Sequence, residues 1–226
     1  MSYRKLFAAL AAVLFASACQ PAGHQASDRT SASASASASA SPSPSASRPR
    51  LTAAQLKAAV LQLSDLPSGY KLDHSDDSVP DNRCVKLMYE LFKGSVMRTY
   101  IDQSSTFSVV ASVDTAAAGR GSATIRRYRD LTDGCGRYTF AEQGVRANVT
   151  FTSEPAPTLL DESAGFVERS VFTDYDSTMT AHLIVFRYGD NVGMVGVGAE
   201  TGSHLASNTV TLARKAAARL RDTANG

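Results

Sequence analysis

The chain has 226 residues, with no tryptophan, four histidines, three cysteines and a formal net charge of only +2. So small a net charge gives no support for a nucleic acid as partner. The cysteines form no Cys-x-x-Cys pair, so the usual spacing of a zinc or redox site is missing. We therefore expect no metal, no cofactor and no nucleic-acid partner.

Known catalytic motifs are also missing, because the chain has no Gly-x-Ser-x-Gly, no His-Glu-x-x-His and no phosphate-binding glycine loop. His182 alternates with Ile184 and Phe186, which is typical of a partly buried strand residue; the alternative is a general base. The acidic loop over residues 73–81 lacks the central glycine and terminal glutamate of a calcium-binding loop, so a solvated loop is favoured. We predict a protein that is not an enzyme and keep a secreted hydrolase as an alternative.

The first 19 residues read as an export signal. Arg4 and Lys5 precede an apolar run over residues 6–18, which ends in small residues before Cys19. This run is too short to span a bilayer, and no other stretch reaches the roughly 20 apolar residues needed. The pattern predicts a lipoprotein signal peptide over 1–18 and acylation of Cys19 on the outer face of the cell membrane. Plain secretion after a cut near Ala18 is the alternative.

Residues 19–50 contain almost nothing that can form a core, and 31–47 are little more than serine, alanine and proline. Such a segment buries too little apolar area to offset the entropy of ordering. We expect a disordered tether with a mean reach of roughly 30 Å. Residues 51–226 then form one domain, which we expect to be monomeric.

Once Cys19 is assigned to lipid, Cys84 and Cys135 are left as a pair. Two thiols in one small domain outside the cytoplasm are expected to form a disulfide. Helical spacing is found over 52–63, from Cys84 to Gly94, over 116–131 and from about 205 to 223. Strand patterns cover 96–102, 106–113, 137–142, 145–152, 165–173, 178–187 and 191–199. The order predicts an α+β fold, a mostly antiparallel curved sheet with packed N-terminal, middle and C-terminal helices.

The order of several short motifs carries a family resemblance. The motifs are Leu63-Ser64-Asp65-Leu66-Pro67-Ser68-Gly69-Tyr70, a cysteine at a helix start, Gly134-Cys135 at a helix end, Leu160-Asp161-Glu162-Ser163-Ala164, and Leu183-Ile184-Val185-Phe186-Arg187-Tyr188-Gly189-Asp190-Asn191 before a terminal helix. Over most of residues 51–218 the chain resembles actinobacterial secreted and lipid-anchored proteins similar to the extracellular sensor domain of PknH-type receptor kinases. The resemblance implies a curved antiparallel sheet with a cleft for an unidentified ligand, but with one disulfide where the kinase-linked members have two.

The last strand pattern suggests a place for a ligand, because Gly193, Gly196 and Gly198 interrupt an otherwise apolar run. Missing side chains leave space on a sheet, unless a bulge or the terminal helix fills it. We predict a groove between sheet and helix for a small molecule, lipid, glycan or protein. Its predicted lining is Tyr70, Met88, Phe92, Arg187, Tyr188, Met194 and Gly196. A lipid carrier is an alternative and would require a large apolar cavity.

The signal predicts that Cys19 is the first residue of the mature protein and carries acyl chains. Mass spectrometry of the membrane fraction should find a lipid-modified N-terminal peptide that begins at Cys19. An unmodified N-terminus in the culture medium would contradict this prediction.

Overall fold

The computed structural model describes residues 48–226 except 74–81, 105, 143–144 and 201–203. Cys19 and the expected signal peptide therefore lie outside the described residues. The helices are α2 (Ala53–Ala59), the short 3₁₀ turn η1 (Leu63–Asp65), α3 (Arg83–Phe92), α4 (Gly121–Cys135) and α5 (Leu205–Asn225). The strands are β1 (Tyr70–Leu72), β2 (Val96–Asp102), β3 (Phe107–Thr115), β4 (Arg137–Glu142), β5 (Val145–Glu154), β6 (Glu162–Phe172), β7 (Ser177–Tyr188) and β8 (Asn191–Ala199).

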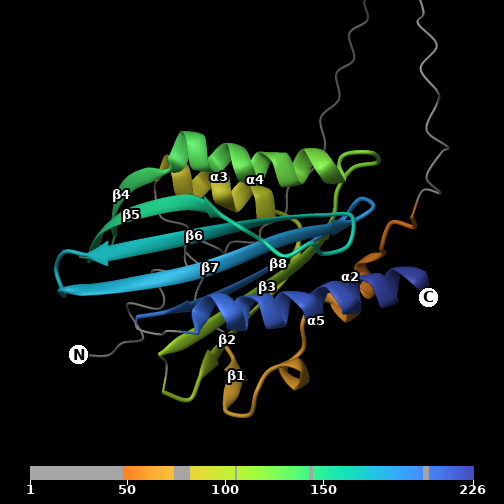
Figure 1. Ribbon diagram of the computed structural model, residues 1–226, viewed down its shortest axis with the longest axis horizontal. Helices are drawn as coiled ribbons and strands as arrows, with labels where there is room; N and C mark the ends of the chain where they lie inside the picture. Colours follow the sequence, from red (N-terminus) through yellow and green to blue (C-terminus); the bar gives the residue numbers. More distant parts are fainter. Residues whose placement is uncertain (1–47, 74–81, 105, 143–144, 201–203) are drawn as a thin grey trace, which may run out of the picture.

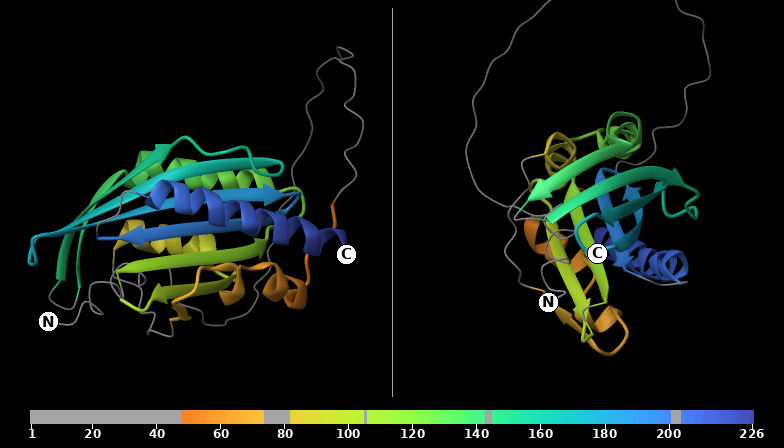
Figure 2. Two further views of the ribbon diagram at one scale, coloured as in Figure 1. Left: turned by 60° about the horizontal axis from the view of Figure 1, so that its bottom comes forward. Right: turned by 90° about the vertical axis from the view of Figure 1, so that its left-hand side faces the viewer.

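The eight strands form one sheet in the order β1-β2-β3-β8-β7-β6-β5-β4. Every pair of neighbouring strands is antiparallel. The sheet is strongly twisted and lies between two layers of helices, α3 and α4 on one face and α2 and α5 on the other (Figures 1 and 2). The predicted α+β class with an antiparallel curved sheet and packed helices is confirmed.

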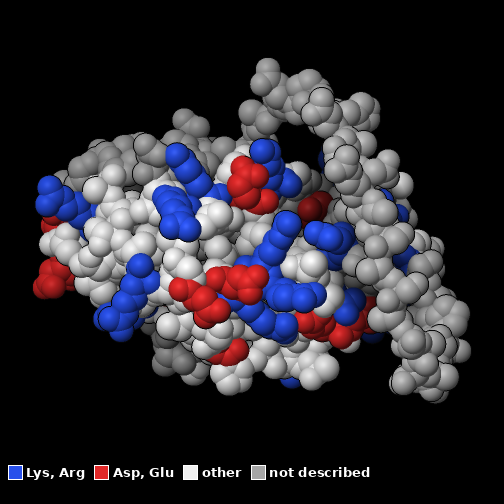
Figure 3. Space-filling view, turned by 90° about the horizontal axis from the view of Figure 1, so that it is seen from above, with Lys and Arg blue, Asp and Glu red and all other residues white. Residues whose placement is uncertain are grey.

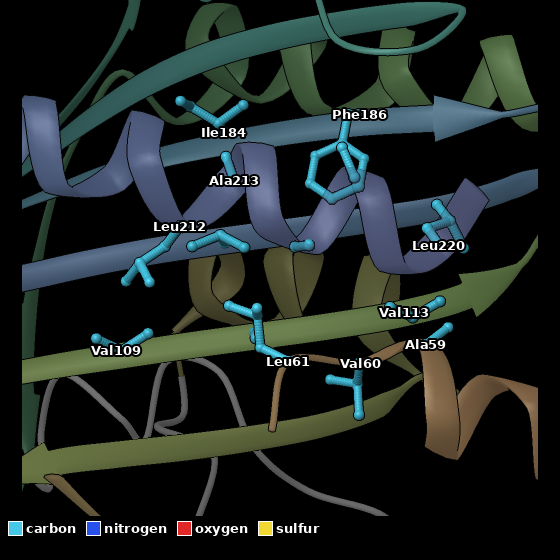
Figure 4. Packing of buried hydrophobic residues seen from close by; sticks show 14 of the residues in the cluster. Ala59, Val60, Leu61, Val109, Val113, Ile184, Phe186, Leu212, Ala213 and Leu220 are labelled. Carbon is cyan, nitrogen blue, oxygen red and sulfur yellow. The ribbon is translucent and has the colours of Figure 1, made fainter. Parts of the chain in front are cut away.

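The face under α2 and α5 is a filled hydrophobic core. Leu212, Ala213 and Leu220 of α5 belong to the same buried cluster as Ile184 and Phe186 of β7, and Figure 4 shows these side chains gathered between helix and sheet. The N-terminus of α2 is stabilised by a capping box, in which Thr52 and Gln55 bond each other's backbone amides. The predicted cover of the sheet by the terminal helix is thus found on this face.

A disulfide links the two helices on the opposite face. Cys84 at the start of α3 is bonded to Cys135 at the end of α4, with their Cα atoms 5.5 Å apart. The two helices therefore run antiparallel and are tied together at one end. The predicted pairing is confirmed.

Several element boundaries differ from the sequence prediction, and two of the differences have a clear local cause. The helix predicted from residue 116 begins at Gly121, because the amides of Gly119 and Gly121 donate to the Asp190 carboxylate at 2.8 and 3.0 Å. This carboxylate in the β7–β8 turn holds the preceding residues outside the helix, and the two amides help to lower its pKa. The loop predicted after Gly69 includes the three-residue strand β1, which pairs with the edge of β2.

Among the described residues, no helix is both long enough and apolar enough to cross a membrane.

The disulfide should contribute substantially to stability, because it closes a loop across a sequence separation of 51 residues. We expect the double change Cys84→Ser and Cys135→Ser to lower the free energy of unfolding by about 4 kcal/mol. Urea denaturation of both proteins measures the difference. Non-reducing peptide mapping of the wild-type protein should recover the two cysteines in one linked fragment, and two freely alkylatable thiols would contradict the pairing.

Candidate functional site

A row of small side chains crosses the sheet beneath α3 and α4. Strand register places Ser108 of β3 opposite Gly198 of β8, and Gly198 opposite Ala181 of β7. The next residue in this row is Glu168 of β6, which pairs with Ala181. Because side chains on one face of a strand repeat every second residue, Gly196 of β8 lies on the same face as Gly198. These residues form the floor of a trough that ends at a carboxyl group.

The trough is roofed by the disulfide-linked helices and walled by aromatic rings. Met88 and Phe92 of α3 and Tyr128 and Leu131 of α4 line it from above. Phe151 of β5 and Phe166 of β6 close one side, stacked with their ring centroids 5.3 Å apart. The enclosed cavity has a volume of about 40 Å³. We call this cavity the slot: a narrow apolar space between α3, α4 and the sheet, with Glu168 at the β6 end.

Glu168 is the only charged side chain that lines the slot among the described residues. It is 7% exposed, and its one hydrogen bond within the described part of the chain comes from the Ser170 hydroxyl at 3.3 Å. No basic side chain there forms an ion pair with it. Burial without a counter-ion disfavours the charged form and raises the pKa of Glu168 to about 7.

Within the part of the chain that the structure describes, two buried hydroxyls near the slot have no hydrogen-bond partner. Thr99 of β2, which is 4% exposed, lines the slot at the end away from Glu168, and its Oγ1 atom is unpaired. The hydroxyl of Tyr138 on β4 is also unpaired, and its pKa is raised mainly by burial and further by the charge of Glu168. An unpaired buried hydroxyl costs free energy, so such groups inside a cavity are suited to a polar ligand atom or a water molecule.

The glycines of β8 have different roles on the two faces of the sheet. A Cβ atom at Gly193 would lie 2.5 Å from the Phe186 ring, so the core under α5 fills that space. The nearest neighbours of a Cβ atom at Gly196 would be the Leu183 side chain at 3.4 Å and the backbone oxygen of His182 at 3.8 Å, which are ordinary contact distances. The predicted filling of the glycine space therefore occurs at Gly193, whereas Gly196 borders the slot.

The structure brings together three of the predicted ligand-binding residues. Met88, Phe92 and Gly196 all line the slot. Met194, which is 1% exposed, lies beside them in a smaller adjoining pocket that also contacts Phe92 and Tyr128. The predicted groove beside the glycine strand is thus roofed by α3 and α4, while the terminal helix packs on the other face.

The other three predicted residues lie elsewhere. Tyr70 and Tyr188 pack against the core under α2 and α5, and the Arg48 guanidinium lies 3.8 Å from the centre of the Tyr188 ring. The Arg187 guanidinium bonds the Glu162 carboxylate at 3.0 Å, which helps to lower the pKa of Glu162. Arg187 is therefore engaged in an ion pair at the margin of the sheet.

His182 lies on the α5 face of β7, because its neighbours in the strand, Ala181 and Leu183, line the slot on the other face. Its Nδ1 atom is 2.9 and 3.0 Å from the two carboxylate oxygens of Glu154. No second carboxyl, histidine or lysine lines the slot among the described residues. Among its described lining residues, the slot thus lacks the paired acid and base that hydrolysis uses.

Within the ranges that the structure describes, no group of three or more acidic, histidine or cysteine side chains could hold a metal ion. The acidic loop lies largely outside these ranges, in residues 74–81. On the outer surface of α3 and α4, basic and acidic side chains are interspersed (Figure 3), and Arg126, Arg127 and Arg129 of α4 are exposed. These arginines occupy the solvent face of an amphipathic helix.

Comparison with known proteins supports a fold relationship. No protein-family model and no curated protein sequence matches the chain. The extracellular domain of PknH from Mycobacterium tuberculosis has a similar structure, with a TM-score of 0.54 and 13% identity, over 79% of this chain and 98% of that chain. A Mycobacterium smegmatis protein described as an Rv0999 ortholog gives a TM-score of 0.38 and 14% identity, over 74% of this chain and 94% of its own. The chain thus shares its fold with the PknH extracellular domain.

Glu168 should make stability depend on pH. Its pKa is raised from 4.5 to about 7 on folding, so the unfolded chain loses this proton first as pH rises. The free energy of unfolding should therefore fall by about 3 kcal/mol between pH 4.5 and pH 7 and then level off. Glu168→Gln, which cannot ionise, should remove this loss.

Urea denaturation of wild type and Glu168→Gln at pH 5, 6, 7 and 8 measures the effect. The difference between the two proteins cancels the titration of all other groups. A difference that stays constant with pH would show that Glu168 titrates normally.

Proposed function

We propose that this protein is an extracytoplasmic, non-enzymatic binding domain, held at the membrane by acylated Cys19, that takes a small amphipathic ligand into the slot. The observation that carries this proposal is the row Ser108-Gly198-Ala181-Glu168, which combines an open apolar floor with one buried carboxyl. Apolar cavities with a few polar groups at defined positions are typical of ligand sites.

Three observations support placement outside the cytoplasm. The first is the signal-like sequence that ends at Cys19. The second is the Cys84–Cys135 disulfide, because such bonds persist in oxidising compartments. The third is the fold shared with an extracellular domain. A sensor-like role, in which ligand binding is passed to a partner protein, fits this placement.

The size of the slot favours a small ligand over the cargo of a lipid carrier. Its volume of about 40 Å³ is enough for a few water-sized groups in a row. A multi-chain lipid needs several hundred Å³ of cavity, as drug-sized ligands do. The slot therefore suits one short apolar chain.

Filling the slot should prevent binding. We expect Gly196→Leu to weaken binding of 1-hexanol at least tenfold, because the new side chain occupies the floor of the trough. Saturation-transfer NMR with the mature chain, residues 19–226 carrying Cys19→Ser, measures this without detergent or lipid. The Cys19→Ser change removes the acyl chains and leaves the domain intact.

Gly134→Leu is the matched control. Gly134 is an exposed helical position in α4 with open space around it, so the same substitution there should leave hexanol binding unchanged. Circular dichroism checks that both variants fold. Unchanged hexanol binding by a folded Gly196→Leu protein, or no binding by wild type, would reject the slot as the site.

A further inference from the structure

We propose that the slot selects an amphiphile with a protonated primary amine on a single short apolar chain, and that the amine pairs with Glu168. This inference rests on the proposed function and specifies its ligand class. It follows from the charge of the slot, the shape of its floor and the hydrogen-bonding capacity left inside it.

When Glu168 is ionised, the slot carries a negative charge without a counter-ion in the described part of the chain. Glu168 is its one charged lining group among the described residues, and no basic side chain in that part of the chain pairs with it. In the low dielectric of a protein interior an opposite charge is attracted strongly, and a ligand cation would replace the missing counter-ion. An anionic head group would be repelled by the same carboxylate.

The shape of the slot restricts the rest of the ligand. The row of small residues runs across neighbouring strands from Glu168 on β6 to Ser108 on β3, and three strand spacings separate these strands. At about 4.8 Å per spacing this row is roughly 14 Å long. A cavity of about 40 Å³ drawn out along such a path is narrow. It admits one unbranched chain and excludes rings or double-chain lipids.

The hydrogen-bonding capacity at the β6 end favours an ammonium group over a hydroxyl. Ser170 donates one bond to Oε1 of Glu168, at 3.3 Å, so acceptor capacity on the carboxylate is left over. A primary ammonium group has three donors, whereas a hydroxyl has one. Hydrogen bonds between charged partners are also about twice as strong as neutral ones.

The titration of Glu168 adds a pH dependence to this geometry. The titratable groups near it are Tyr138 from β4 and Tyr128 from α4, while β5 and β7 present Phe151 and Ala181 beside it. Burial raises the pKa of both tyrosines, so they stay neutral. Glu168, with a pKa of about 7, ionises between pH 5 and pH 8. An alkylamine with a pKa near 10.4 stays protonated over this range, so its affinity should rise about tenfold or more.

The test compares three probes with the same chain and different heads: hexylamine, 1-hexanol and hexanoate. Calorimetric titration of the mature chain at pH 8 should give hexylamine at least tenfold tighter than hexanol, and hexanoate weaker than hexanol. Glu168→Gln should bring hexylamine to within about twofold of hexanol, because the amide carries no charge. Gly134→Leu is the control, because Gly134 is exposed on α4 with open space around it, and this variant should keep the amine preference.

Proton release on binding can be measured with the wild-type protein alone, so this test does not depend on whether a variant folds. Hexylamine binding at pH 6.5 should release about 0.8 of a proton per ligand, because ionised Glu168 is the form that pairs with the amine. Titrations in two buffers of different ionisation enthalpy measure this release. Hexanol binding without an amine preference, a preference that persists in Glu168→Gln, or no proton release would overturn the inference. Failure of all three probes to bind would instead reject the proposed function.

Discussion

The central constraint on this fold is that strand β8 lies between two layers of helices, which cover both faces of the sheet. All nine of its residues are buried. On the α5 face the core fills the space that Gly193 leaves, because the Phe186 ring occupies the position of a Cβ atom. On the α3 and α4 face Gly196 and Gly198 leave space that no side chain fills completely. One strand therefore completes a packed core on one side and the floor of a cavity on the other.

The roof of the cavity depends on the disulfide between α3 and α4. The apolar side of α3 consists of Val85, Met88 and Phe92, and these residues must cover the slot without filling it. A ten-residue helix is marginal without tertiary contacts. The bond at Cys84 fixes its first turn to the longer helix α4, so the roof keeps its position above a floor that offers few contacts.

Much of the fold could be predicted from the sequence, because apolar periodicity and turn residues define most elements directly. The prediction was weakest where a distant side chain sets a boundary, as Asp190 does for the start of α4. Gly196, Met88 and Phe92 could be connected with a groove because they are small or apolar. Thr99 could not, because only the sheet register places a strand residue in a cavity.

The strand pattern of β6 contains evidence for a special role of Glu168 that the sequence prediction did not use. Alternate residues Phe166, Glu168, Ser170 and Phe172 share one face of β6, and a carboxyl between two phenylalanines on a buried face is a conflict within the strand pattern. The predicted site relied instead on the glycines that interrupt the last strand and on Arg187, whose charge is satisfied by Glu162.

The cost of Glu168 supports the proposal that the slot is a binding site and not a packing defect. A glutamine of the same shape would avoid the penalty of a buried, uncompensated charge, and an apolar side chain would extend the aromatic wall formed by Phe151 and Phe166. The carboxyl instead sits at the end of the one row of side chains that is small enough to admit a chain. Loss of stability at a place where open space and a buried carboxyl coincide is expected when a ligand supplies the missing partner. The proposed site would also make affinity for an amine depend on pH. Glu168 must be ionised to pair with the amine, and burial opposes this ionisation.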